Sequence, residues 1–422
     1  MDSGRDRRYL VNEVPEVARL PQSSRPAVVF FGHAGFAYGH LARCHKIARQ
    51  LVNLFSFDAY VVSSCPEYEP GEPDPAVHEV LLPGFRLGSP DSIPERLPIP
   101  DRASSLSHVP TDQLSAHRGR LLLALVTHLR PHAVLLEGFP FVRPLQAVEE
   151  CGPTLDYLSE RCPETVRCAG FNGVPTSLWM DEHASLVTEA LDRWLDRLCV
   201  YVDPSERASL FERSPWLARV SSKVSLSGYV VGAPPEAAEA ARQVLAMFGG
   251  GVDAFGKAAL IVEAFRVFAF RRPGWRLDLV TGGQFPEKGY DELVRRIGER
   301  TDIRVRRVVP GLSRWLNHYQ LVMSMAGYNA CTELYQATTR SIVLPRVAPD
   351  FGEQLEQARK FQKVGAIDCI VDAEQTSPEA LAELMARTLE EPPSRRLPVD
   401  IRGAETTARM LASERNAAEP AR

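Results

Sequence analysis

Glycines and histidines gather at residues 32–51, which read GHAGFAYGHLARCHKIARQL. Gly35 and Gly39 let the backbone turn sharply between a predicted strand and a predicted helix. The helix would begin near His40, where free backbone N–H groups and the positive end of the helix dipole favour a negative charge. His40 or His33 could accept a proton from a substrate, and the alternative is that each histidine only caps or hydrogen-bonds the loop.

A second glycine-rich segment, FGGGVDAFGKAALIVEAF, occupies residues 248–265. Gly249, Gly250 and Gly251 precede a predicted helix from about residue 255, so their backbone amides could cradle a pyrophosphate. The segment lacks the Gly-Lys-Ser/Thr ending of a P-loop, which disfavours ATP hydrolysis. A plain tight turn between a strand and a helix is the alternative.

Two later segments could bind the hydroxyl groups of a nucleotide or a sugar. SMAGYNACTELYQA, at residues 324–337, carries Glu333 about one turn into a predicted helix, where a carboxylate can accept two hydrogen bonds from a ribose diol. LPRVAPDFGEQLEQARKF, at residues 344–361, places Glu353 and Gln354 at the start of another helix. Since acidic residues are favoured near helix N-termini, each could also be an ordinary solvent-facing residue.

The elements that must position these residues alternate along the chain. Short apolar runs, such as AVVFF and RLDLV, are followed by helical patterns of ten or more residues. This alternation predicts parallel sheets with helices on both faces. The glycine clusters follow strands, and ligands of open parallel sheets bind beyond the carboxyl ends of the strands. We therefore expect an α/β protein with two Rossmann-like domains facing each other across a cleft.

The length of 422 residues is enough for two or three domains. A linker is predicted in the Pro/Ala-rich stretch GAPPEAAE, and both ends of the chain have weak periodicity. The predicted divisions are a flexible segment at 1–25, an N-terminal domain at 26–232, a C-terminal domain at 233–393 and a tail at 394–422.

Composition narrows the classes of partner. The net charge of -4 gives no strong field that would attract nucleic acid or an anionic membrane. The eight cysteines show no CxxC spacing and complete no zinc site with histidines, so we expect buried free thiols in a reducing cytoplasm. No apolar run approaches the roughly 20 residues that a membrane-spanning helix needs. We expect a cytoplasmic monomer or homodimer with no integral membrane segment, no nucleic-acid partner and no metal.

Taken in chain order, the four segments resemble those of GT-B glycosyltransferases, specifically the MurG-like group typified by the bacterial N-acetylglucosaminyl transferase of peptidoglycan synthesis. Gly39-His40 matches a Gly-His pair after the first strand, and the triple glycine matches a Gly-Gly loop that opens the C-terminal domain. SMAGYNACTE matches the segment that supplies a ribose-binding glutamate, and Glu353-Gln354 matches a pair that contacts the donor sugar. The triple glycine continues VDAFG, whereas the family has a Ser-Gln pair there.

The resemblance implies GT-B architecture, with the acceptor on the N-terminal domain and a nucleoside-diphosphate sugar, UDP favoured, on the C-terminal domain. No cofactor is implied, because loop amides and a helix dipole would stabilise the leaving diphosphate where other transferases use a metal. The chain also has no D-x-D sequence. The donor-binding residues implied are Gly249, Gly250, Gly251, Val309, Ala326, Gly327, Tyr328, Asn329, Glu333, Glu353 and Gln354.

The preferred general base is His40, because imidazole titrates near working pH, and Glu137 and Asp181 are the alternatives. His33, Gly35 and Gly39 would line the acceptor and phosphate loop. No apolar patch with basic flanks is evident near the first helix, which favours a soluble small-molecule acceptor, and the abundance of arginine makes secondary metabolism plausible. Two rival functions stay open: a sugar-nucleotide epimerase or hydrolase of the same fold, and a nucleotide-sugar-binding partner protein without catalysis.

Overall fold

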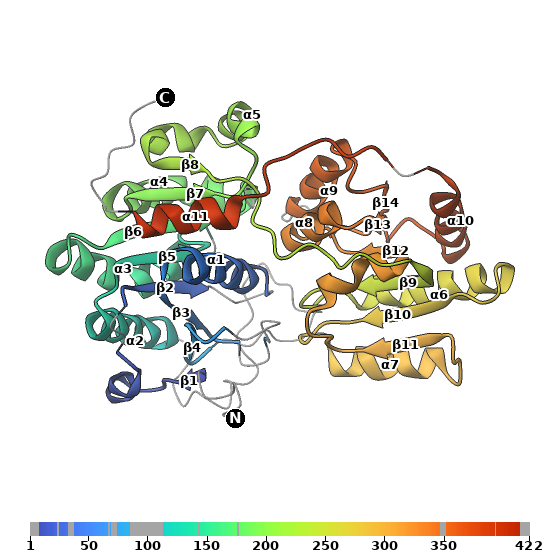
Figure 1. The fold of residues 1–422 in the computed structure, drawn as a ribbon, viewed down its shortest axis with the longest axis horizontal. Coiled ribbons are helices and arrows are strands. Elements are labelled where there is room, and N and C mark those ends of the chain that lie inside the picture. Colours follow the sequence, from blue (N-terminus) through green and yellow to red (C-terminus); the bar gives the residue numbers. More distant parts are fainter. Residues whose placement is uncertain are drawn as a thin grey trace.

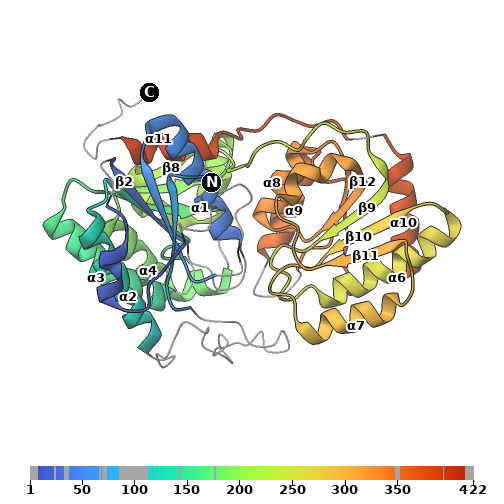
Figure 2. The same ribbon diagram turned by 60° about the horizontal axis from the view of Figure 1, so that its bottom comes forward.

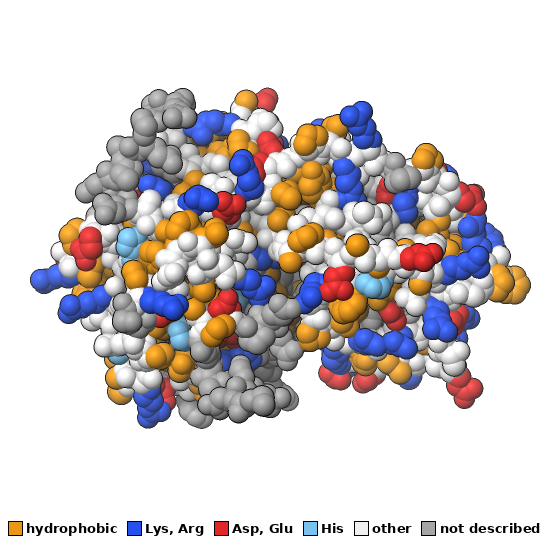
Figure 3. All heavy atoms as spheres, in the orientation of Figure 1, with side chains coloured by type: hydrophobic (Ala, Val, Ile, Leu, Met, Phe, Trp, Pro, Cys, Tyr) orange, Lys and Arg blue, Asp and Glu red, His pale blue; other side chains and the backbone are white. Residues whose placement is uncertain are grey.

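The computed structural model describes residues 8–22, 25–32, 38–65, 68, 74–84, 113–141, 144–174, 177–346, 352–392 and 394–413. They form two lobes, each built on a parallel sheet with helices on both faces (Figure 1). The two lobes touch along their boundary in the space-filling view (Figure 3). The predicted α/β architecture with two Rossmann-like domains is therefore confirmed.

The sheet of the N-terminal domain has eight strands in the order β1-β4-β3-β2-β5-β6-β7-β8, all parallel to their neighbours. Its central strands are buried on both faces, as their continuous apolar sequences require. The strands are β1 (Arg8–Leu10), β2 (Ala27–Gly32), β3 (Asp58–Ser63), β4 (Val77–Leu81), β5 (Ala133–Glu137), β6 (Val166–Phe171), β7 (Arg197–Val200) and β8 (Val224–Leu226).

The helices around this sheet include one that the sequence patterns do not predict. Helix α3 contains Gly152 and Pro153, a pair that is typical of a turn, yet it continues through both. The helices are α1 (Gly39–Phe55), α2 (Leu114–Leu129), α3 (Pro144–Arg161), α4 (Ser177–Trp194) and α5 (Arg207–Arg213), with short 3-10 helices η1 (Val14–Arg19), η4 (Pro204–Glu206) and η5 (Pro215–Lys223).

Both ends of the chain contribute elements to the N-terminal domain. Strand β1, within the segment predicted to be flexible, pairs with β4, and its Arg8 forms an ion pair of 2.6 Å with Glu79. Helix α11 (Gly403–Ala412), within the predicted tail, packs against α1 and β5. The chain thus crosses from the C-terminal domain back to the N-terminal one (Figure 1). Burial of Ala404, Ala408 and Leu411 on one face of α11 explains why this helix docks.

The sheet of the C-terminal domain has six parallel strands in the order β11-β10-β9-β12-β13-β14. Helices α8 and α9 lie on the side toward the N-terminal domain, and α6, α7 and α10 lie on the far side (Figure 2). The strands are β9 (Ala241–Met247), β10 (Arg276–Val280), β11 (Ile303–Arg306), β12 (Tyr319–Ser324), β13 (Arg340–Val343) and β14 (Cys369–Ile370). The helices are α6 (Phe255–Arg271), α7 (Glu287–Ile297), η6 (Leu312–His318), α8 (Tyr328–Gln336), α9 (Glu353–Lys363) and α10 (Pro378–Glu390).

Each sheet has one point at which the strand order reverses direction, between β2 and β5 in the first sheet and between β9 and β12 in the second. Ligands of open α/β sheets bind at such points, beyond the carboxyl ends of the strands. At the first point, α1 follows β2 and Glu137 ends β5. At the second point, the triple glycine follows β9 and α8 follows β12. The fold therefore places the predicted site segments at both switch points.

Tyr328, the first residue of α8, is buried where the two domains meet. Its hydroxyl accepts a hydrogen bond of 2.8 Å from the backbone N–H of Val230, at the start of the linker, and donates one of 3.0 Å to the carbonyl of Tyr201. One continuous apolar cluster contains Tyr328 together with core residues of both sheets. The domains are consequently joined by a packed interface as well as by the linker.

In the described part of the chain, no helix combines the length and the apolar character needed to cross a membrane. All eight cysteines carry free thiols, as expected, and seven of them are buried.

Candidate active site

A fully buried carboxylate, Glu137, ends strand β5 at the switch point of the first sheet. One of its oxygens accepts a hydrogen bond of 2.7 Å from Nε of Arg43, and the other accepts one of 2.8 Å from the hydroxyl of Tyr201. The Nδ1 atom of His40 lies 3.2 Å from the first oxygen. Three elements that are far apart in the sequence therefore meet at one negative charge.

Glu137 stays ionised in this environment. Burial alone would raise its pKa, but the charge of Arg43 and the hydrogen bonds from His40 and Tyr201 outweigh burial and lower the pKa to about 2. So acidic and so enclosed a group is a weak proton acceptor for a substrate. Its position suits it to orienting His40 and to neutralising Arg43.

His40 lies in the first turn of α1, and about a quarter of its side chain is exposed. Its Nδ1 faces two groups of opposite character: the carboxylate of Glu137 and Nη2 of Arg43, which lies 2.9 Å away. A guanidinium can only donate and a carboxylate can only accept, so the tautomer of His40 decides which contact is a hydrogen bond. With the proton on Nδ1, His40 donates to Glu137 and its Nε2 is left able to accept a proton.

Arg43 is buried between the aromatic rings of the two domains. Burial opposes its charge, but Glu137 and the neighbouring tyrosines raise the pKa of the guanidinium, so it stays protonated. The guanidinium carbon lies 5.0 Å from the ring centre of Tyr328 and 5.9 Å from that of Tyr201, within the range of cation–π attraction. Because Tyr328 belongs to α8, the charge cluster around Glu137 is in contact with the C-terminal domain.

Gly170 leaves the space that the Glu137 carboxylate fills. It lies on β6, directly opposite Glu137 in the strand register. A Cβ atom at this position would lie 2.2 Å from a carboxylate oxygen of Glu137 and 2.1 Å from the hydroxyl of Tyr201. Any side chain here would therefore displace the hydrogen bond between these two residues.

The triple glycine forms the predicted turn between β9 and α6. Gly249 and Gly251 have φ angles of 58° and 81°, in the left-handed region that favours glycine. A Cβ on Gly251 would lie only 1.8 Å from the carbonyl oxygen of Thr281, so the turn packs tightly on the loop after β10. Gly250 accepts a hydrogen bond of 2.8 Å from the backbone N–H of Gln284. Helix α6 then begins without a side-chain cap, leaving its first amides available to an anion.

The residues that replace the family's Ser-Gln pair place an acid beside this helix start. The carboxylate of Asp253 accepts a hydrogen bond of 2.5 Å from Nε of Arg346, which follows β13. Burial opposes its ionisation, but Arg346 and nearby Lys257 lower its pKa. The pKa of Lys257 is itself lowered by burial. Two cations and one anion therefore adjoin the predicted diphosphate site.

Glu333 lies on α8 and faces the N-terminal domain. Its carboxylate is 3.3 Å from Nζ of Lys46 on α1, and the same ammonium group donates a hydrogen bond of 3.2 Å to Asn329. Asn329 in turn donates one of 3.1 Å to the carbonyl of Gly39. The structure thus brings together three predicted site residues, and it adds Lys46, which the sequence did not single out.

The predicted sugar-contacting pair is also hydrogen-bonded. Glu353, the first residue of α9, accepts a hydrogen bond of 2.5 Å from the side-chain amide of Asn172 in the N-terminal domain. Gln354 accepts one of 2.8 Å from the backbone N–H of Arg346. Glu353 therefore lies at the boundary between the domains.

The other predicted residues are placed as follows. Ala326 is buried, Gly327 is the N-cap of α8, and Val309 lies half-buried in the loop after β11. His33 and Gly35 lie outside the described residues. Asp181 belongs to α4, but its side chain is outside the described part of the structure.

Sequence reasoning missed several residues of this site: Arg43, Lys46, Gly170, Asn172, Tyr201 and Arg346. One signal was present for Arg43, because it follows His40 by three positions and so lies on the same face of α1. Pairings such as Glu137 with Tyr201 join separate strands, and nothing in their local sequence indicates them.

Comparison with known proteins gives a family match for the C-terminal part of the chain. Residues 282–410 match the glycosyltransferase family 28 C-terminal domain. This match begins after the triple glycine and includes Glu333 and the Glu353-Gln354 pair. The sequence has no match among curated proteins.

Several solved structures share the fold. The glycotransferase of kitacinnamycin is 13% identical, with a TM-score of 0.52 over 92% of this chain and 95% of its own. The spinosyn rhamnosyltransferase SpnG is 16% identical, with a TM-score of 0.50 over 92% and 95%. The UDP-GlcNAc 2-epimerase from Methanocaldococcus jannaschii is 11% identical, with a TM-score of 0.53 over 91% and 99%.

The solved structures show that the chain has the GT-B fold, as the resemblance predicted. The part of the chain that carries the family's signature is a glycosyltransferase family 28 C-terminal domain.

The first prediction concerns the stability that Glu137 provides. Replacing Glu137 with Gln leaves Arg43 buried without a charge partner, so we expect a loss of about 3–5 kcal/mol in the free energy of unfolding at pH 7. The native pKa of Glu137, about 2, lies below its usual value of 4.5. The stabilisation is therefore complete above about pH 4.5 and declines as the pH falls toward 2. The difference in the free energy of unfolding between the wild type and the Glu137→Gln variant should narrow over this range. Denaturant unfolding at several pH values measures this difference.

Glu405→Gln is the matched control, since Glu405 pairs with Arg409 on the surface of α11 and should contribute about 0–1 kcal/mol. Equal stability of the Glu137→Gln variant and the wild type at pH 7 would contradict the assigned charge pairing.

The second prediction concerns Gly170. Gly170→Ala should displace the Tyr201 hydroxyl from Glu137, and we expect destabilisation of about 1–3 kcal/mol. Tyr201→Phe removes the same hydrogen bond without a steric clash. Removing the Tyr201 hydroxyl also relieves part of the clash with the added Cβ atom at position 170. The Gly170→Ala/Tyr201→Phe double variant should therefore be destabilised by less than the sum of the two single variants. Strict additivity in urea unfolding would count against this packing.

Proposed function

We propose that the protein transfers a sugar from a nucleoside-diphosphate sugar, with UDP favoured, to a soluble small-molecule acceptor, with inversion and without a metal. One observation carries this proposal. The partly exposed His40, which the buried Glu137 carboxylate holds, lies at the interface with the domain that matches family 28. The histidine supplies a base for the acceptor, and the donor domain supplies a site for the leaving nucleotide.

The donor would bind at the switch point of the second sheet. The uncapped start of α6 and the amides of the triple-glycine turn would meet the diphosphate, where they stabilise negative charge as it develops on the leaving group. Arg346 and Lys257 would add positive charge beside them, which offsets the carboxylate of Asp253. This arrangement would replace the missing Ser-Gln pair and the metal used by other transferases.

The nucleoside would be held by α8. Glu333 would accept hydrogen bonds from the two ribose hydroxyls, and the loop containing Val309 would contact the base. Because Lys46 is paired with Glu333, the ribose must share or replace this partner. Glu353 and Gln354 would then contact the sugar.

The acceptor would be activated by His40. With Nδ1–H donated to Glu137, Nε2 takes the proton of the attacking hydroxyl or amine as the new glycosidic bond forms. The bond from the anomeric carbon to the diphosphate breaks as the electron pair leaves with the nucleotide. A single displacement of this kind inverts the anomeric configuration.

The third prediction tests the base. His40→Ala should lower turnover about 10²- to 10⁴-fold, because general base catalysis contributes about this much, while nucleotide affinity stays nearly unchanged. His128→Ala is the control, since His128 lies on α2 and contacts the carbonyl of Leu20, away from this site. Steady-state rates and calorimetric titration with UDP separate the two effects. Full turnover by His40→Ala would show that another group is the base.

The fourth prediction tests the ribose contact. Glu333→Ala should weaken UDP binding about 10- to 100-fold, the effect of losing charge-assisted hydrogen bonds. Lys46→Met removes the ion-pair partner of Glu333 but leaves the carboxylate, so it should not reproduce this loss. Equal weakening by both variants would assign Glu333 to the domain interface instead of the ribose.

The experiment that tests the function is incubation with a panel of UDP-, dTDP-, GDP- and ADP-sugars, with and without a broad panel of soluble acceptors. A glycosylated product that forms only when the acceptor is present supports the transferase. Release of nucleotide or an epimerised sugar without acceptor would favour an epimerase or hydrolase. Tight nucleotide binding with no turnover would favour a binding protein.

A further inference from the structure

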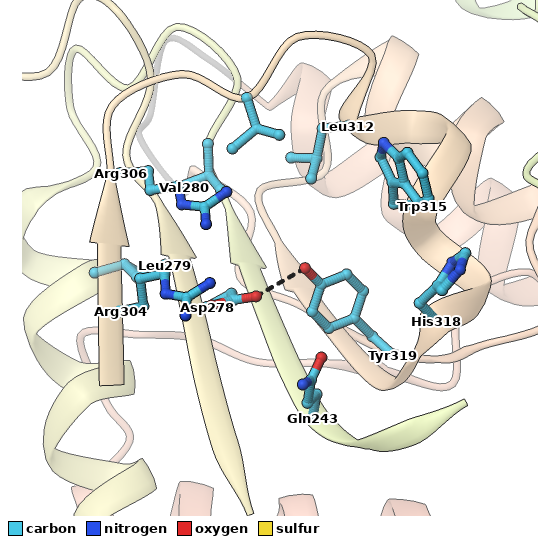
Figure 4. A pocket seen from close by; sticks show the side chains of 11 residues that line it. Gln243, Asp278, Leu279, Val280, Arg304, Arg306, Leu312, Trp315, His318 and Tyr319 are labelled. Carbon is cyan, nitrogen blue, oxygen red and sulfur yellow. Dashed lines mark hydrogen bonds between the residues drawn. The ribbon is translucent and has the colours of Figure 1, made fainter. Parts of the chain in front are cut away.

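A pocket of about 300 Å³ opens on the C-terminal domain, against one face of its sheet (Figure 4). Helices α6 and α7 cover the other face of this sheet (Figure 2), and η6 contacts β9 and β12 on the pocket side. The strand face between β11 and η6 therefore remains open, and its side chains line the pocket.

One wall consists of two arginines, Arg304 and Arg306, which are two residues apart on β11 and so project from the same face. Both are exposed, and neither guanidinium forms a hydrogen bond or an ion pair with a residue that the structure describes. In Figure 4 both side chains extend from β11 over the neighbouring strand. Most other arginines of this domain pair with acidic side chains, so two without such partners in one pocket are suited to bind an external anion.

The opposite wall is aromatic. Trp315 and His318 project from η6 with their ring centres 5.1 Å apart, and 43% of Trp315 is exposed. Nδ1 of His318 is buried without a hydrogen-bond partner among the described residues. Tyr319 donates a hydrogen bond of 2.9 Å to Asp278 across the floor of the pocket (Figure 4). This bond engages the only carboxylate among the described lining residues.

We propose that this pocket binds a small planar organic anion: a single aromatic or heteroaromatic ring that bears a carboxylate or phosphate. The arginines would hold the acidic group, and the ring would lie against Trp315. A volume of about 300 Å³ is at the lower end of ligand pockets, so one ring with its acidic group fits better than a whole nucleotide sugar.

The pocket is separate from the proposed donor site. All the described residues that line it belong to the C-terminal domain, and of these only Val309 also appears in the predicted donor set. On its other side, η6 binds the interdomain linker through two hydrogen bonds. The backbone N–H of Glu236 donates one of 2.8 Å to the carbonyl of Arg314, and the side chain of Asn317 donates one of 3.0 Å to the carbonyl of Glu236. A ligand here would lie next to the segment that connects the domains.

Calorimetric titration of the full chain with four probes tests the proposal. Phenyl phosphate and benzoate combine a flat ring with an anionic group, cyclohexanecarboxylate has the charge without the flat ring, and inorganic phosphate has no ring. We expect binding of at least one aryl anion, with a dissociation constant several-fold lower than those of both non-aromatic probes. The better of the two aryl probes identifies the preferred acidic group.

Variants locate the site. The Arg304→Ala/Arg306→Ala double variant should weaken aryl binding at least 10-fold, and Trp315→Ala should weaken it several-fold. Arg295→Ala, an exposed arginine on α7, should leave binding unchanged. These residues are at the surface, and circular dichroism verifies that each variant is folded. The proposal is overturned if no aryl anion binds, if the double variant binds as the wild type does, or if UDP displaces the probe competitively.

Discussion

One buried negative charge organises the candidate active site. Glu137 ends the central strand of the first sheet, where burial would favour its neutral form, and it stays ionised because Arg43, Tyr201 and His40 converge on it. The same contacts fix the side chain of His40 at the start of α1. Gly170 is part of this arrangement, since only a residue without a side chain leaves space for the carboxylate.

This charge cluster extends to the C-terminal domain through Arg43, whose guanidinium lies over the ring of Tyr328. Tyr328 in turn bonds the linker and the backbone of the N-terminal domain. One turn further along α8, Glu333 meets Lys46 of α1. The groups proposed for the ribose and for the acceptor thus lie on two helices, α1 and α8, that contact each other directly. Movement of the domains would change both sites together.

The sequence predicts the two-domain architecture because alternating apolar runs and helical patterns report burial, which is a local property of each segment. It also indicates His40, Glu333 and the triple glycine, since each belongs to a turn or a helix that follows a strand. It does not indicate α3, because Gly152 and Pro153 suggest a turn and tertiary packing overrides that local preference. Nor does it indicate the pairing of Glu137 with Tyr201 or of Asp253 with Arg346, because these contacts depend on strand order, which only the folded sheet defines.

The central claim is that Glu137 holds His40 with its proton on Nδ1, so that Nε2 can act as the base. Long-range ¹H–¹⁵N NMR of histidine-labelled protein tests it most directly, with His40→Gln used to assign the signal. We expect the neutral His40 ring to carry its proton on Nδ1 and to lose this preference in Glu137→Gln. A proton on Nε2, with Nδ1 accepting from Arg43, would contradict the account, because that tautomer cannot take a proton from the acceptor through Nε2.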